Sequence, residues 1–231
     1  TSPSVDYQVK TTNNVVIEVK SAADLPDVSR ILEISEPWIN GEIIVPSAYL
    51  GSIIQLINSV RGIQKNLSYI EKELALVSFE APLANVLTDF YDDLKSISSG
   101  YGSFNYDLSG YKPEDLVRVD ILVGGEMVDS LSIITHRSES LSVGRKITEK
   151  LKEVIPRQLF EVSLQAAIGG KVIAREDVKA MGKNVTAKLY GGDVSRKNKL
   201  LDKQKKGKKR MKKIGKVDIP AEAFMVLLKK D

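Results

Sequence analysis

The residues with the clearest capacity for chemistry form a basic run near the end of the chain. Between residues 196 and 216 the sequence holds twelve lysines and arginines and one acid, Asp202. Such side chains neutralise phosphates and release the counterions that a polyanion carries. Subtracting the run from the 34 basic and 30 acidic residues of the chain leaves 22 bases against 29 acids. The positive charge is therefore concentrated in one place, which predicts a dedicated contact with a polyanion.

The run is predicted to form a helix over residues 194–214. A narrow stripe of non-basic residues recurs at spacings of 4, 3, 4 and 3, and the lysines occupy the remaining circumference. The stripe consists of Leu200, Gln204, Gly207, Met211 and Ile214. Gly207 is interpreted as a packing position that allows close approach to a supporting sheet, with a hinge as the alternative.

Three partners for this helix are weighed: solvent, a membrane surface and a nucleic acid. Like charges four residues apart, such as Lys205 and Lys209, repel each other, and a solvated face would interleave acids with bases. A stable interfacial helix needs a broad apolar face with Trp, Phe or Leu, and this stripe is narrow. Nucleic acid is favoured. A peripheral module or scaffold on anionic membrane remains the alternative function.

The sequence contains few residues that could form a catalytic site. The chain has no cysteine and one histidine, His136, so no Cys–His or His–His pair can form. Gly100 and Gly102 precede a predicted strand instead of opening a helix, so the dinucleotide-binding motif is absent. No glycine–lysine pair is followed by Ser or Thr, so the P-loop motif is absent as well. We interpret Asp89, Asp92 and Asp93 as residues on the solvent-facing side of an amphipathic helix. We expect no catalytic site, metal or cofactor in this chain.

The elements that must position the basic run fall into two expected domains. Residues 36–113 alternate as strand 41–45, helix 50–60, strands 63–70 and 74–81, helix 82–94 and strand 102–108, the βαββαβ order of a ferredoxin-like sandwich. Residues 1–35 are interpreted as the remnant of a preceding domain and a linker.

The second expected domain covers residues 114–231. Strands are predicted at 117–123, 127–134, 160–167, 171–179 and 185–190, with hairpins at the glycine pairs 124–125 and 169–170 and a helix ending before Pro156. The predicted fold class is α+β: a ferredoxin-like βαββαβ sandwich followed by a mainly antiparallel β domain wrapped around a long basic helix.

The ends of the chain predict a fragment of a longer protein. The first residues carry no initiator Met and no secretory signal, and the longest apolar run, residues 223–228, is too short to cross a bilayer. A cytoplasmic location is expected, bacterial by default, with an organellar relative as an alternative.

The sequence resembles the C-terminal part of the LepA family of translational GTPases, also called elongation factor four or back-translocase. The residues that carry the resemblance are PSAYLGSIIQL (46–56), RGIQKNLSY (61–69), APLANVLTDFYDDLKSISSGYGSFNYD (81–107), DLVRVDILVGGEMVDSLSIITHR (115–137), IPRQLFEVSLQAAIGGKVIARE (155–176) and AKLYGGDVSRKNKLLDKQKKGKKRMKKIGKVDIPAEAF (187–224). The first part is of a type shared with other translational GTPases, including elongation factor G. The last three motifs are similar to the C-terminal domain of LepA itself.

The resemblance implies a module of a ribosome-dependent GTPase whose G domain, with its GTP and Mg, lies upstream. The implied partners are the large ribosomal subunit, through its RNA and stalk base, and tRNA near its acceptor end. Weak peripheral membrane association of the full-length protein is also possible, and no obligate oligomer is expected. The step of translation affected, whether back-translocation, initiation, fidelity or subunit maturation, stays open.

Two sets of site residues follow. The expected RNA-binding residues are Arg196, Lys197, Lys199, Lys203, Lys205, Lys206, Lys208, Lys209, Arg210, Lys212 and Lys213, joined by His136, Arg137 and Tyr190 in loops expected beside the same end. The expected ribosome-contact loops contain Arg61, Gln64, Lys65, Ser99, Tyr101 and Ser103.

Overall fold

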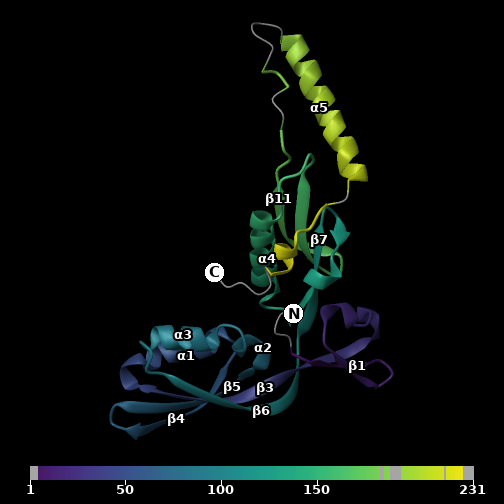
Figure 1. Cartoon of the computed structure of the whole chain (residues 1–231). Helices are drawn as coiled ribbons and strands as arrows, with labels where there is room; N and C mark the ends of the chain where they lie inside the picture. Colours follow the sequence, from purple (N-terminus) through teal and green to yellow (C-terminus); the bar gives the residue numbers. More distant parts are fainter. Residues whose placement is uncertain (1–4, 183–184, 188–193, 216, 226–231) are drawn as a thin grey trace. The chain divides into compact units, whose positions relative to one another are not determined.

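A computed structural model describes residues 5–182, 185–187, 194–215 and 217–225 of the chain (Figure 1). It combines helices with antiparallel sheets, which confirms the predicted α+β class. Contacts divide the chain into two units, the first running to Leu116 and the second beginning at Val117. Each unit has its own sheet and its own hydrophobic core.

The first unit is built on a six-stranded antiparallel sheet. Its strands are β1 (Tyr7–Thr11), β2 (Val16–Val19), β3 (Ile31–Pro46), β4 (Ile63–Glu71), β5 (Leu74–Pro82) and β6 (Ser103–Glu114). Strands β6, β3, β5 and β4 lie in that order, with every neighbouring pair antiparallel, which is the arrangement of a ferredoxin-like sheet. The first residues of the long β3 also pair with β1, so β1 and β2 extend the same sheet.

Helices cover one face of this sheet and bury apolar side chains against it. The helices are α1 (Leu50–Ser59), α2 (Leu83–Val86) and α3 (Phe90–Ile97), with short 3-10 turns at Ala22–Asp24, Val28–Arg30 and Ser47–Tyr49. Phe90 on α3 packs against Phe79 and Phe104, with ring centroids 5.7 and 5.0 Å apart. The single helix predicted from Pro82 is wrong: the chain turns between α2 and α3. That break leaves Leu87 exposed and directs Phe90 and Leu94 into the core.

A buried ion pair ties the helix layer of the first unit to its sheet. The Nη2 atom of Arg61, just after α1, donates to both carboxylate oxygens of Glu36 at 2.8 and 3.0 Å and to Oδ1 of Asn85 at 3.3 Å. The side chain of Glu36 is 1% exposed and that of Arg61 is 16% exposed. Burial, reinforced by the Glu36 carboxylate, raises the pKa of the nearby Tyr7 hydroxyl above its ordinary value. The charge of Glu36 is thus compensated inside the fold.

The second unit is built on a five-stranded sheet. Its strands are β7 (Leu116–Val123), β8 (Glu126–Met127), β9 (Ile133–His136), β10 (Val162–Ile168) and β11 (Lys171–Val178), in the order β11-β10-β7-β8 with β9 also paired to β7. Both glycine-pair hairpins are present, and all four glycines have φ between 55° and 95°, where glycine has no Cβ penalty. The continuous strand predicted over 127–134 is wrong, because a 3-10 turn at Asp129–Leu131 buries Leu131 and separates β8 from β9. The predicted strand 185–190 is a turn over residues 185–187, and its remainder lies outside the described residues.

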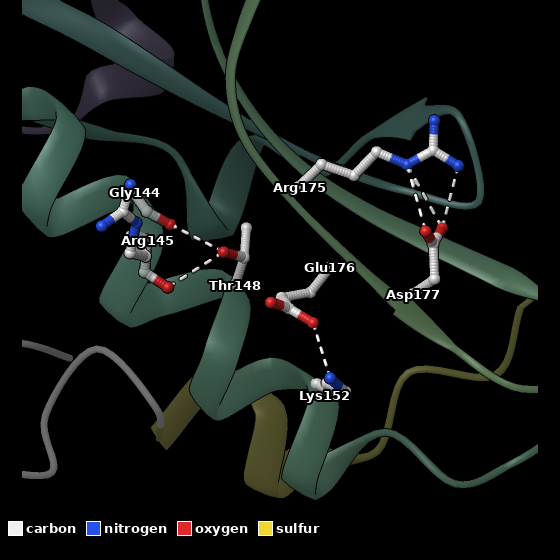
Figure 2. Close-up of polar contacts among 7 residues, drawn as sticks. All are labelled: Gly144, Arg145, Thr148, Lys152, Arg175, Glu176 and Asp177. Carbon is white, nitrogen blue, oxygen red and sulfur yellow. Dashed lines mark hydrogen bonds and ion pairs between the residues drawn. The ribbon is translucent and has the colours of Figure 1, made fainter.

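Helix α4 (Ser140–Val154) packs on the β10–β11 side of this sheet (Figure 2). A Cβ on Gly144 would lie 3.0 Å from the Cβ of Ala166, so the absence of a side chain lets α4 lie close to β10. The Thr148 hydroxyl donates to the carbonyls of Gly144 and Arg145 at 3.1 and 2.9 Å, and Lys152 contacts Glu176 of β11 at 2.6 Å. The expectation that the sheet wraps around the basic helix is therefore wrong. The helix that packs on the sheet is α4, because α4 carries the apolar face with Ile147 and Leu151.

Candidate nucleic-acid interface

The basic run forms helix α5 (Val194–Ile214), a 21-residue helix with no acid in its first turn. Among its described side chains none is buried: Lys197, Leu200, Gln204 and Lys208 are half-buried, and the other lysines are exposed. The side chain of Lys213 lies outside the described residues, and Tyr190 lies outside them altogether. A helix that is polar on almost its whole circumference directs its charges outward instead of toward a core.

Most basic side chains of α5 have no acidic partner among the residues that the structure describes. Within the described ranges, eight lysines and Arg210 of α5 make no ion pair or side-chain hydrogen bond, whereas Arg196 has an interaction within the chain. Some basic side chains of the first unit are paired: Lys112 and Lys65 lie 2.7 and 2.9 Å from Glu80, and their hydrogen bonds hold the pKa of that carboxyl below its ordinary value. Like charges crowded on one helix repel each other. The surface of α5 is therefore strongly positive in the part of the chain that the structure describes.

The predicted stripe of α5 is partly present, but Gly207 does not act as a packing position. Leu200, Gln204 and Gly207 are half-buried, while Met211 is 48% exposed. A Cβ on Gly207 would meet no heavy atom within 4 Å. The interpretation of close approach at Gly207 is wrong, because the helix does not lie on the sheet at this point.

The close approach occurs instead at Gly215, immediately after α5. A Cβ there would lie 2.5 Å from the ring of Phe160 and 2.9 Å from the carbonyl oxygen of Met211. Phe160 belongs to the core of the second unit, and Val217, Ile219 and Ala223 after it pack into the same core. Ala223 lies on the short helix α6 (Ala221–Phe224). Gly215 and residues 217–223 therefore fasten the C-terminal end of α5 to the folded unit.

We expect Gly215→Ala to destabilise the second unit by about 1–3 kcal/mol, because overpacking forces the Phe160 ring or the backbone to move. Gly207→Ala is the matched control on the same segment. It adds the same methyl group in open space and is expected to stabilise the helix by up to about 1 kcal/mol. Thermal unfolding followed by circular dichroism compares the two. Equal melting temperatures for both variants would contradict the assignment of Gly215 as the anchor.

A cavity of about 640 Å³ lies beside this anchor. It is lined by Pro156, Arg157, Gln158, Leu159, Phe160, Met181, Arg210, Met211, Gly215 and Asp218. Sequence reasoning missed it because its walls come from three separated segments. The only local signal is the apolar Leu159 and Phe160 directly after a proline and two polar residues.

His136 and Arg137 lie at the opposite end of α4 from this anchor. His136 ends β9 just before α4, and its Nδ1 accepts a hydrogen bond from the backbone N–H of Ser138 at 3.3 Å. Phe160 follows the other end of α4 in the chain. The 15 residues of α4 separate the two ends by about 22 Å. The prediction that His136 and Arg137 lie beside the same end as the basic helix is therefore wrong.

The expected ribosome-contact residues of the first unit form two groups. In the first group, Ser99 accepts a hydrogen bond from the Tyr49 hydroxyl at 3.3 Å and so lies near the start of α1. Tyr101, which is 71% exposed, and Ser103, at the start of β6, follow it in the chain. The other group, Arg61 with Gln64 and Lys65 on β4, follows the end of α1, about 15 Å away for a helix of 10 residues.

The second group is largely engaged within the protein. The guanidinium of Arg61 is bound to Glu36, and Lys65 is bound to Glu80. Tyr101 and Gln64 remain exposed side chains.

Among the described residues, no cluster of His, Cys, Asp or Glu has the geometry to hold a metal ion. In the same part of the chain, no helix has the length and apolar character needed to span a bilayer.

Comparison with known families first defines the class of protein. Residues 33–122 match the family described as elongation factor G C-terminus, which covers most of the ferredoxin-like unit. Residues 123–229 match the family described as GTP-binding protein LepA C-terminus, which covers most of the second unit and α5. The two matches adjoin, and together they define the C-terminal region of a translation factor.

The relatives identify the particular family. The chain is 53% identical over its whole length to elongation factor 4 of Ruminiclostridium cellulolyticum and 51% identical to that of Campylobacter lari, and it covers 38% and 39% of those proteins. It thus spans about two fifths of the length of the curated relatives it matches. A crystal structure from Thermus thermophilus covers 35% of the chain at 26% identity with a TM-score of 0.33, which is too low to support an argument. The chain belongs to the LepA, or elongation factor 4, family, and it carries the C-terminal domains of that family, as the resemblance predicted.

Proposed function

We propose that this chain is the RNA-binding C-terminal module of a translational GTPase, and that α5 holds phosphates of tRNA near its acceptor end. The observation that carries the proposal is the set of nine basic side chains on α5 without an ion pair in the described part of the chain. Each of these charges can neutralise one phosphate, and the release of condensed counterions supplies the free energy of binding. The match of the same residues to a LepA C-terminal family supports a partner in translation.

The mechanism is electrostatic and steric. The ferredoxin-like unit docks on the large ribosomal subunit, near its stalk base and RNA, and presents Tyr101 and its neighbouring loop. The second unit carries α5 to the tRNA. GTP hydrolysis takes place in a G domain upstream of this chain, where GTP and Mg bind, and controls release. The protein works where translation takes place, in the cytoplasm.

A salt titration of the affinity for tRNA tests the proposal. With about six to eight phosphates engaged, the plot of log K against log salt is expected to have a slope of about −5 to −7. The same titration with large ribosomal subunits and with anionic vesicles separates RNA from lipid. A slope near zero for tRNA, or tighter binding to vesicles than to RNA, would overturn the proposal.

A further inference from the structure

The cavity beside Gly215 has features that phosphate binding does not use. Three of its wall residues are apolar and about half exposed: Leu159 at 57%, Met181 at 51% and Met211 at 48%. Phe160 also lines it. Apolar side chains that remain exposed around a concave surface mark a place where an apolar group docks. Its volume lies within the range of pockets that enclose small ligands.

We propose that this cavity receives an unstacked nucleobase from a single-stranded part of the RNA that α5 binds. This inference rests on the proposed function of α5. Arg210 belongs to α5 and also lines the cavity, so a phosphate held by the helix and the base attached to a neighbouring sugar can be bound together. Guanidinium planes and apolar side chains pack against the faces of splayed-out bases.

Gln158 favours a base over a purely apolar occupant. Its side chain lines the cavity, and its Nε2 is buried and has no hydrogen-bond partner among the described residues. A buried donor without a partner is unfavourable. A base edge carries ring nitrogens and carbonyl oxygens that accept hydrogen bonds, whereas an aliphatic side chain or an acyl chain carries none. A base whose edge the Gln158 amide turns to meet would satisfy this donor, while its faces pack on the apolar walls.

The test uses the whole chain and two RNA hairpins with the same stem and the same short 3′ extension. One extension carries purine bases, and the other is abasic, so the number of phosphates is equal. We expect the wild-type chain to bind the base-bearing probe about tenfold more tightly. The double variant Leu159→Ser, Met211→Ser is expected to remove this difference while its affinity for the abasic probe stays unchanged. Leu201→Ser is the matched control, because Leu201 is 48% exposed on α5 and does not line the cavity.

Three other results would contradict the base-binding inference, and one of them would also contradict the proposed function. Equal wild-type affinity for the two probes would overturn the base-binding inference and leave the proposed function standing, since both probes are bound. The same conclusion follows if the double variant weakens both probes to the same extent. Failure of the wild-type chain to bind either probe would overturn the proposed function and this inference together.

Discussion

Replacement of Lys205, Lys206, Lys208 and Lys209 by glutamate is expected to lower the affinity for tRNA by about three orders of magnitude at low salt. Each lysine that neutralises a phosphate contributes about 0.9 to the salt slope for duplex nucleic acid, so the slope is expected to decrease in magnitude by about 3 to 4. All four side chains are exposed or half-buried, and none has an ion pair within the described ranges. The fold of the second unit should be retained. Fluorescence anisotropy with labelled tRNA measures the affinity, and circular dichroism checks the fold.

A variant with the same change in net charge separates local contact from overall attraction. Lys10, Lys20, Lys72 and Lys146 are exposed, make no ion pair among the described residues and lie outside α5. Their replacement by glutamate is expected to have a much smaller effect, through long-range attraction that salt screens. If the two quadruple variants lose the same affinity, α5 is not the contact surface.

Arg61→Met is expected to destabilise the first unit by about 3–5 kcal/mol and to lower its melting temperature by about 10–20 °C. The substitution leaves the Glu36 carboxylate, 1% exposed, without the guanidinium that donates to both of its oxygens. Methionine keeps much of the side-chain volume, so the loss reflects the charge and the hydrogen bonds more than a cavity.

Arg30→Met is the control for this substitution. Arg30 is exposed, and its side chain has no ion pair among the described residues. Differential scanning calorimetry of the three proteins should show an early transition only for Arg61→Met. An unchanged transition would mean that the ion pair contributes nothing to stability, and Arg61 would then be available as a ribosome contact.

The order of elements was predictable from local patterns. Apolar residues alternate with polar ones in residues 77–81, and Ile53 and Ile57 have helical spacing; each pattern indicates an element with one buried face. The glycine pairs at 124–125 and 169–170 indicate hairpins. These signals lie within a few residues of one another in the sequence. They therefore predict elements and their succession, and the predicted βαββαβ order is confirmed.

Contacts between distant segments were not predictable. Glu36 and Arg61 are 25 residues apart, and neither lies in a motif that singles out its partner. The same holds for Phe160 and Gly215, whose contact fastens α5. The basic character of the interface could be predicted because charge is additive along the sequence. The cavity could not be predicted, because its shape arises only from packing.

The packing of α5 shows the limit of periodicity. The spacing of Leu200, Gln204 and Gly207 correctly predicted one less exposed side of the helix. It did not predict how little that side is covered, because periodicity reports which residues share a face and not what lies opposite. Gly207 was assigned to packing for its size, whereas the contact is made by Gly215.

The core of the second unit, as far as the structure describes it, contains no residue of α5. Away from the anchor at Gly215, substitutions of the exposed lysines of α5 and of the core residues should therefore act additively on stability, since these two sets share no hydrogen bond or ion pair among the described residues. If α5 binds RNA as proposed, the number of its lysines is expected to change the affinity while the fold of the second unit stays the same. The residues proposed to set binding strength and the residues that form the core are then largely separate sets.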